Sequence, residues 1–250
     1  FTIEKGKTLG IVGESGCGKS TTGRAILRLL EPTDGQVIFN GQDITALSSS
    51  KMRQMRRDMQ IIFQDPFSSL DPKKTVSQTI AEPIIENKIL KDKKAIDARV
   101  RELMATVGLA ERLVNAYPHE LDGGRRQRIG IARALAMEPK FIVCDEPVSA
   151  LDVSIQAQIL NLMQDLQEQM GLTYIFITHD LSVVNHFAND IAVMYLGQLI
   201  EKAPSVTLFD NPVHPYTKAL LSAIPVPSLR KKRQRVMLKG EISSPINPKP

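Results

Sequence analysis

Short apolar runs alternate with longer amphipathic stretches along most of the chain. Apolar runs of about five residues next to Gly, Pro or Asp are typical of buried strands, and apolar positions three or four residues apart are typical of helices. We expect strands at residues 7–12, 36–40, 59–63, 141–145, 173–177, 191–195 and 198–201. We expect helices at residues 19–30, 51–57, 91–107, 121–137 and 153–170, and another from residue 181. Strands that alternate with helices in this way predict an α/β fold with a mainly parallel sheet covered on both faces.

Residues 65–115 break this pattern. Prolines, the last of them Pro83, punctuate the start of the stretch, and helical periodicity follows. We therefore expect a helical subdomain at about residues 66–125, inserted in an α/β domain that spans residues 1–224. Residues 225–250 are rich in proline and carry a basic cluster, so we expect a C-terminal tail there.

Composition narrows the class of protein. The chain has 250 residues, 42% of them apolar, and its 32 Lys and Arg against 27 Asp and Glu give a net charge of +5. These values argue against a disordered chain, and the apolar runs are too short for a membrane span. Two cysteines exclude a disulfide scaffold and are typical of a reducing compartment. Because the chain begins at Phe1 without a leader, we interpret it as a fragment whose first strand is already under way.

The first chemical motif follows the first predicted strand. Gly13-Glu14-Ser15-Gly16-Cys17-Gly18-Lys19-Ser20 matches the phosphate-binding pattern G-x-x-x-x-G-K-[ST] between a strand and a helix. The glycines let backbone N–H groups point inward, and the helix N-terminus adds a positive end. We expect nucleotide phosphates to bind at Gly13, Ser15, Gly16, Cys17, Gly18, Lys19, Ser20 and Thr21. Lys19 would reach the β- and γ-phosphates, and the Ser20 hydroxyl would ligate Mg²⁺.

Polar side chains follow three further predicted strands. The strand at 141–145 ends in Asp145 and Glu146, His179 follows the strand at 173–177, and Gln64 follows the strand at 59–63. Ligands bind at strand ends in α/β sheets, so Asp145 can hold Mg²⁺ through a water and Glu146 can polarise an attacking water. Gln64 could contact Mg²⁺ and that water, and His179 could donate to the γ-phosphate. Each residue alone is also compatible with an ordinary turn or a structural histidine.

Taken in chain order, these motifs resemble those of an ABC-type ATPase cassette over most of the sequence. The matching segments are Gly13–Ser20, Gln64, Leu121–Arg128, Asp145-Glu146, Ser149–Asp152 and His179. Three longer segments, Phe63–Pro72, Asp145–Ser154 and His214–Thr217, resemble the oligopeptide/dipeptide importer branch of that family.

This resemblance implies an ATPase that binds ATP and Mg²⁺ and powers the import of oligopeptides or dipeptides. It implies that Lys19, Gln64, Glu146 and His179 are catalytic and that Ser20, Gln64 and Asp145 serve the metal. It further implies a head-to-tail dimer that sandwiches ATP between one phosphate loop and the partner's signature, here Asp122, Gly123 and Gly124. The helical insertion would contact two membrane permease subunits at the cytoplasmic face of the membrane, with an extracytoplasmic peptide-binding protein supplying cargo. Nickel or another small solute is the alternative cargo.

The chain departs from the family pattern in three places. The aromatic residue that stacks on adenine lies upstream of the first strand and is not included in this chain. Members often continue into a cysteine-bearing C-terminal segment, so for a chain that stops at Pro250 we expect no iron–sulfur cluster. The signature usually reads Leu-Ser-Gly-Gly-Gln, whereas here Asp122 replaces the serine and Arg125 the glutamine. We hypothesise that Asp122 weakens or alters one ATP site and that the partner is a related subunit rather than a copy.

Four other classes of function fit the sequence less well. A DNA-repair ATPase of the same superfamily needs long coiled coils, and a translation-type member usually carries two cassettes. This sequence has one set of cassette motifs and no sustained heptads. A nucleic-acid-binding module would use the basic tail, but aromatic residues make up only 5% of the chain, so we expect no nucleic-acid partner. Anionic lipid headgroups remain an alternative for that tail. A small P-loop kinase would leave the segment Leu121–Arg128 without a role.

Overall fold

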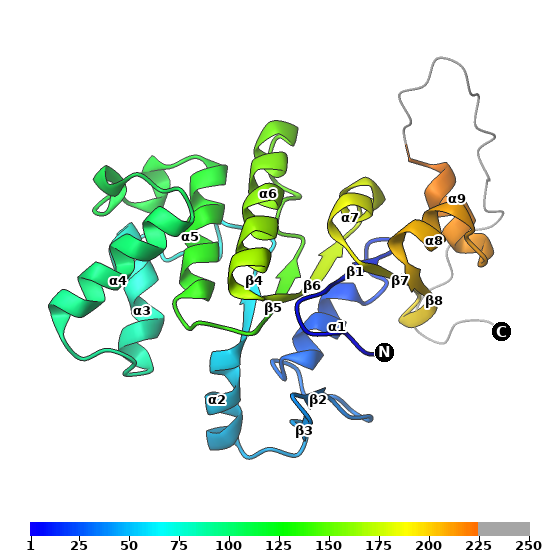
Figure 1. The fold of residues 1–250 in the computed structure, drawn as a ribbon, viewed down its shortest axis with the longest axis horizontal. Coiled ribbons are helices and arrows are strands. Elements are labelled where there is room, and N and C mark those ends of the chain that lie inside the picture. The colour runs from blue at the N-terminus through cyan, green and yellow to red at the C-terminus, as the bar shows by residue number, and fades with distance from the viewer. Residues whose placement is uncertain (225–250) are drawn as a thin grey trace.

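The computed structural model describes residues 1–224 and has an α/β architecture built on one six-stranded sheet (Figure 1). The strands follow the order β4-β5-β6-β1-β7-β8; the first five of these are parallel, and β8 runs antiparallel to β7. Their bounds are β1 (Thr8–Val12), β4 (Met59–Ile62), β5 (Phe141–Asp145), β6 (Thr173–Thr178), β7 (Asp190–Tyr195) and β8 (Gln198–Pro204). The predicted fold class is confirmed.

Both faces of the sheet are covered, so its central strands are apolar at successive positions. Along β5, Ile142 and Cys144 pack into one core, and Phe141 and Val143 into the other. Side chains alternate between the faces of a strand, so a strand buried on both sides has no polar face. In Figure 1 α6 and α7 lie on one side of the sheet, and α2 and the small β2–β3 hairpin lie on the other.

Helices provide the two layers. Their bounds are α1 (Lys19–Ile26), α2 (Ser49–Asp58), α3 (Val76–Glu86), α4 (Lys93–Thr106), α5 (Gly123–Leu135), α6 (Val153–Met170), α7 (Leu181–Phe187), α8 (Ser205–Asp210) and α9 (Pro215–Ser222), with 3₁₀ turns η1 (Glu111–Leu113) and η2 (Pro118–Glu120). Within residues 1–224, none of these helices is long and apolar enough to cross a bilayer.

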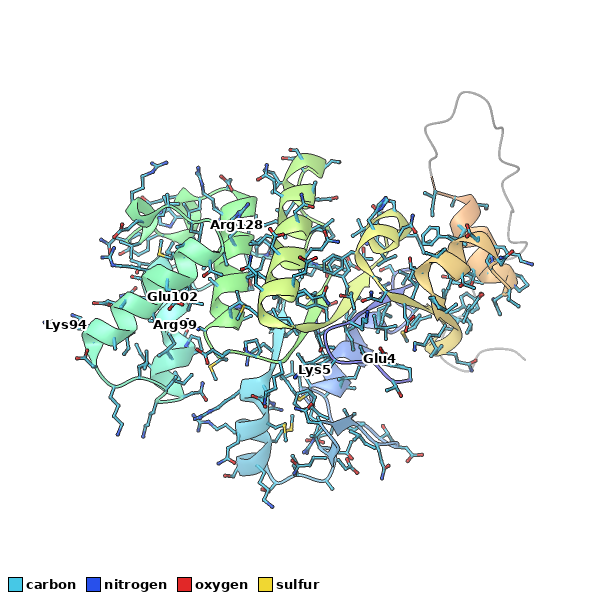
Figure 2. All side chains as sticks on the ribbon, in the orientation of Figure 1. Glu4, Lys5, Lys94, Arg99, Glu102 and Arg128 are labelled. Atoms are coloured by element: carbon cyan, nitrogen blue, oxygen red, sulfur yellow. The ribbon has the colours of Figure 1, made fainter. Side chains whose placement is uncertain are left out.

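Helices α3, α4 and α5 pack on one another beside the β4 edge of the sheet (Figure 1). Arg128 of α5 donates to the carbonyl oxygen of Val107 at 2.5 Å, which satisfies a backbone group at the end of α4. On α4, Arg99 pairs with Glu102 at 2.8 Å, and Figure 2 labels both residues in this group of helices. These helices occupy most of the range predicted for the inserted helical subdomain, whose division from the rest of the chain stays a prediction.

The structure shortens one predicted helix and contains another that was not predicted. The first predicted helix was to reach residue 30, but α1 ends at Ile26 and Arg28 adopts a φ of 50°. The Arg28 guanidinium then donates to the carbonyls of Ile44 and Leu47, so the chain gains tertiary contacts where the helix stops. Helix α3 was not predicted, since Pro83 was interpreted as punctuation ahead of the helical periodicity; it lies inside α3, where burial of Ile80 and Ile84 holds the helix together.

The structure also differs from the prediction at both margins of the sheet. The strand expected at 36–40 is only the two-residue β2 (Ile38–Phe39), which pairs with β3 (Gln42–Asp43) in a separate small sheet. Helices α8 and α9 were not predicted, because each is shorter than the window that reveals helical periodicity. The predicted tail at 225–250 lies outside the described residues.

Candidate functional site

The phosphate-loop motif forms the turn between β1 and α1. Gly13 has a φ of 154°, and a Cβ there would lie 2.3 Å from the carbonyl oxygen of Met194, so no larger residue fits. Gly18 is the N-cap residue of α1, with a φ of 99°, and offers no side chain to cap the helix. The N–H groups of the first turn therefore lack a side-chain acceptor from the cap residue and can bind an anion.

Lys19 folds back across this loop. Its side chain is buried, and its Nζ donates to the carbonyl oxygens of Gly13 at 2.8 Å and Glu14 at 2.9 Å. Two backbone acceptors thus hold a positive charge at the loop, and no carboxylate of residues 1–224 forms an ion pair with it. A charge held in this way is free to attract phosphate.

The hydroxyl of Ser20 points to the end of β5. It donates to Oδ1 of Asp145 at 2.6 Å, and the other carboxylate oxygen lies 3.6 Å from Arg24 Nη2. Hydroxyl and carboxylate oxygens are ligands that Mg²⁺ prefers, and the ion commonly completes its shell with waters and substrate phosphates. Within residues 1–224 no group of three or more His, Cys, Asp and Glu side chains forms a metal site of its own. The donor set therefore fits a magnesium ion that arrives with a nucleotide.

Glu146 is the centre of a second polar group. Its Oε2 accepts from Gln64 Nε2 at 3.0 Å and lies 3.1 Å from His179 Nδ1. The backbone of Glu146 is left-handed, with a φ of 47°, and its N–H donates to the carbonyl of Ile177 on β6. Such a conformation costs about 1–3 kcal/mol outside glycine and is found mostly at functional sites.

One cavity of about 460 Å³ joins these two groups. Its lining residues are Ser15, Gly16, Gly18, Lys19, Ser20, Thr21, Gln64, Glu146 and His179. They come from the carboxyl ends of β1, β4, β5 and β6, which are neighbours in the parallel sheet. Gly13, Cys17 and Asp145 do not line the cavity but lie directly beside it, through their contacts with Lys19 and Ser20.

The predicted residues Asp122, Gly123 and Gly124 do not reach this cavity. Asp122 is the N-cap of α5; it accepts from the N–H of Arg125 at 2.8 Å and lies 3.3 Å from the Arg125 guanidinium. A Cβ on Gly124 would lie 2.7 Å from Ile155 of α6, so the glycine permits close packing between the two helices. Asp122 therefore caps α5 and pairs with Arg125 within the first turn of the same helix.

The segment after Gln64 is held against α5. The guanidinium of Arg126 lies 3.7 Å from the ring centre of Phe67, and Arg133 donates to the carbonyl of Ser69 at 2.6 Å. The N–H of Phe67 donates to Asp65 and lowers the pKa of that carboxyl. Sequence reasoning missed the contacts made by Arg126 and Arg133, because their partners are far away along the chain.

Two further ionisable groups close to the site are shielded from water. Burial, together with the negative charge of Asp145, raises the pKa of the Cys144 thiol well above its ordinary value. Burial likewise raises the pKa of Tyr216 to about 12, and the hydroxyl of this residue accepts from the N–H of Glu14 in the phosphate loop. The Tyr216 contact was also missed, although the segment His214–Thr217 had been singled out.

Comparisons with known proteins agree with this geometry. Residues 1–149 match the family model described as ABC transporter, and residues 200–249 match the one described as oligopeptide/dipeptide transporter, C-terminal region. The oligopeptide transport ATP-binding protein OppF of Bacillus subtilis is 58% identical over 244 residues, which cover 97% of this chain and 80% of that protein. AppF of the same organism, also an oligopeptide transport ATP-binding protein, is 55% identical over 251 residues, covering 99% and 76%.

Solved structures show the same fold. The cbiO1 subunit of the ABC transporter complex cbiONQ from Clostridium perfringens superposes with a TM-score of 0.77 at 29% identity, covering 84% of this chain and 82% of that chain. The dimeric ATP-binding cassette MJ0796, bound to ADP and Pi, gives a TM-score of 0.74 at 31% identity, covering 82% and 88%.

Proposed function

The chain belongs to the ABC transporter family and is an ATP-hydrolysing cassette; on this premise we propose that it powers the import of oligopeptides. The observation that carries the proposal is the cavity where the phosphate loop, Ser20 beside Asp145, and Glu146 between Gln64 and His179 meet. The names of the relatives and the match of residues 200–249 favour peptides over nickel as cargo.

The phosphates of ATP would bind over the first turn of α1. Backbone N–H groups from Ser15 to Thr21 would contact the phosphate oxygens, and Lys19 would place its charge on the β- and γ-phosphates. Ser20, Asp145 and Gln64 would hold Mg²⁺, directly or through water. When bound, the ion supplies charge neutralisation on the phosphates.

Hydrolysis would need one proton acceptor. A water oxygen would attack the γ-phosphorus while the bond to the ADP oxygen breaks, and the water proton would pass to the carboxylate of Glu146. Gln64 and His179 contact the same oxygen of that carboxylate and would orient it and the water. Most of the catalytic effect would come from positioning and charge neutralisation.

A second ATPase subunit would complete the site. Asp122, Gly123 and Gly124 lie outside the chain's own cavity, which suits a signature that faces the phosphate loop of a partner in a head-to-tail dimer. A carboxylate about 4 Å from one phosphate charge costs roughly 4 kcal/mol at an effective dielectric of 20. Because Arg125 pairs with Asp122, part of this cost would be offset. A related subunit with an unaltered signature would best serve this chain's own cavity.

The remaining partners follow from transport. Two membrane permease subunits would dock on the α3–α5 region at the cytoplasmic face, and an extracytoplasmic binding protein would deliver the peptide. Uptake of labelled oligopeptide and of nickel by cells lacking this chain tests the proposal. We expect peptide uptake to be lost and nickel uptake to be retained, with recovery on return of the wild-type chain but not of Glu146→Gln. Unchanged peptide uptake would contradict the proposed cargo.

A further inference from the structure

The peptide group that joins Gly13 to Glu14 is hydrogen-bonded on both sides. Its carbonyl oxygen, from Gly13, accepts from Lys19 Nζ at 2.8 Å. Its N–H, from Glu14, donates to the hydroxyl of Tyr216 at 3.1 Å. The N–H and C=O of a trans peptide point in opposite directions within its plane, so Tyr216 and Lys19 bind opposite edges of one rigid planar group. A single peptide group therefore links the two side chains.

Tyr216 is firmly placed for this contact. Only 3% of the residue is exposed, and its ring centre lies 4.5 Å from that of Tyr195 on β7. Burial raises the pKa of Tyr216 to about 12, and the oxygen of the neutral hydroxyl has the lone pairs that accept from the Glu14 N–H.

The start of α9 is anchored as well. The carboxylate of Glu201 on β8 accepts from the N–H groups of Val213 at 2.8 Å and His214 at 3.0 Å. His214 caps the helix, since its Nδ1 accepts from the N–H of Tyr216 at 3.1 Å. The hydroxyl that reaches the phosphate loop thus comes from the region that matches the oligopeptide/dipeptide transporter family model.

Gly13 cannot fix this peptide group by itself. Glycine has the widest backbone freedom, and here no side chain can be added because Met194 O and Cys17 Sγ occupy the space. An outside contact is needed to keep the Gly13 carbonyl turned toward Lys19. We propose that Tyr216 is a positioning residue for the phosphate loop, which orients the 13–14 peptide group and through it the Lys19 ammonium. This inference rests on the proposed role of Lys19 in binding ATP.

The test is Tyr216→Phe, which removes the hydroxyl and leaves the ring against Tyr195. We expect the affinity for Mg-ATP, measured by calorimetry, to fall roughly 3- to 10-fold, as for the loss of one hydrogen bond. The same variant should increase amide exchange at Glu14 in the nucleotide-free protein, measured by NMR. The melting temperature without nucleotide should change little. Tyr195→Phe removes a hydroxyl from the other ring of the pair and is the matched control; we expect it to bind Mg-ATP as the wild type does.

The outcomes separate this inference from the proposed function. If the wild type binds Mg-ATP but Tyr216→Phe binds equally well with unchanged exchange at Glu14, the positioning role is wrong and the ATPase assignment stands. If both tyrosine variants weaken binding equally, or only the melting temperature falls, Tyr216 serves packing alone and the inference is overturned. If the wild type itself does not bind Mg-ATP, both ideas fail.

Discussion

Replacing Glu146 by Gln tests the proposed chemistry with little change in shape. The variant keeps a side-chain oxygen that can accept from Gln64 Nε2, which lies 3.0 Å from Oε2 of Glu146 in the wild type. It also keeps an L-residue at the φ of 47°, so no new backbone strain arises. What it loses is the negative charge and the ability to accept a proton from water. Binding of ATP should therefore survive while hydrolysis fails.

The size of the effect follows from the role of the carboxylate. General-base catalysis contributes roughly 10²- to 10⁴-fold to a rate, which corresponds to about 3–5 kcal/mol of activation free energy. We expect phosphate release at saturating Mg-ATP to fall by roughly this factor. The dissociation constant for Mg-ATP should stay within about 3-fold of the wild type, because the phosphate contacts of α1 are untouched.

The assay is steady-state phosphate release by the chain together with its partner ATPase subunit, with ATP affinity measured in parallel. Glu168→Gln, an exposed carboxylate near the end of α6, is the matched control and should leave both quantities unchanged. Turnover of Glu146→Gln within 10-fold of the wild type would refute the proton-acceptor role, since roughly 100-fold is the least a general base contributes.

Three further changes test the packing around the site. Gly13→Ala places a Cβ 2.3 Å from the carbonyl oxygen of Met194 and should lower the free energy of unfolding, measured with urea, by about 1–3 kcal/mol. Gly130→Ala is the control, because its Cβ would meet no described atom within 4 Å, and it should cost nothing. Equal costs for the two variants would contradict the close packing at Gly13. Asp122→Ala removes the N-cap of α5 and should cost about 0.5–2 kcal/mol, whereas Asp122→Ser should be nearly neutral; a neutral Asp122→Ala would show that the cap is not needed. Because the pKa of Cys144 is raised in the folded state, only the unfolded chain gains its thiolate, so the free energy of unfolding should fall as pH rises above about 8.5. In Cys144→Ala the free energy of unfolding should fall less steeply with pH, and a slope identical to that of the wild type would contradict a contribution from the Cys144 thiol.

The central strands of the sheet could be predicted from sequence because they are buried on both faces. The predicted bounds of β5 match the structure, and those of β6 differ by one residue. Helix ends were harder, since tertiary contacts decide them. Arg28 stops α1 by binding backbone carbonyls of a later segment, and Pro83 is carried inside α3 by buried neighbours. Neither contact leaves a local signal in the sequence.

Sequence reasoning found more of the residues that line the candidate site than of the helix ends around it. Four of its parts follow strand ends, and parallel strands bring such ends together at one edge of a sheet. The supporting contacts escaped notice because they join distant positions. Tyr216 and Glu14 are 202 residues apart, and nothing near either residue names the other.

Every role proposed for this chain requires that the phosphate loop binds Mg-ATP. Isothermal titration calorimetry of the folded chain with Mg-ATP measures this binding directly. The Lys19→Ala variant is titrated in parallel, after its melting temperature has been shown to be unchanged. We predict saturable binding by the wild type and a loss of roughly 100-fold or more in the variant, since one charge near a phosphate is worth about 4 kcal/mol at an effective dielectric of 20. Absence of binding by the folded wild type, or equal binding by Lys19→Ala, would contradict the account.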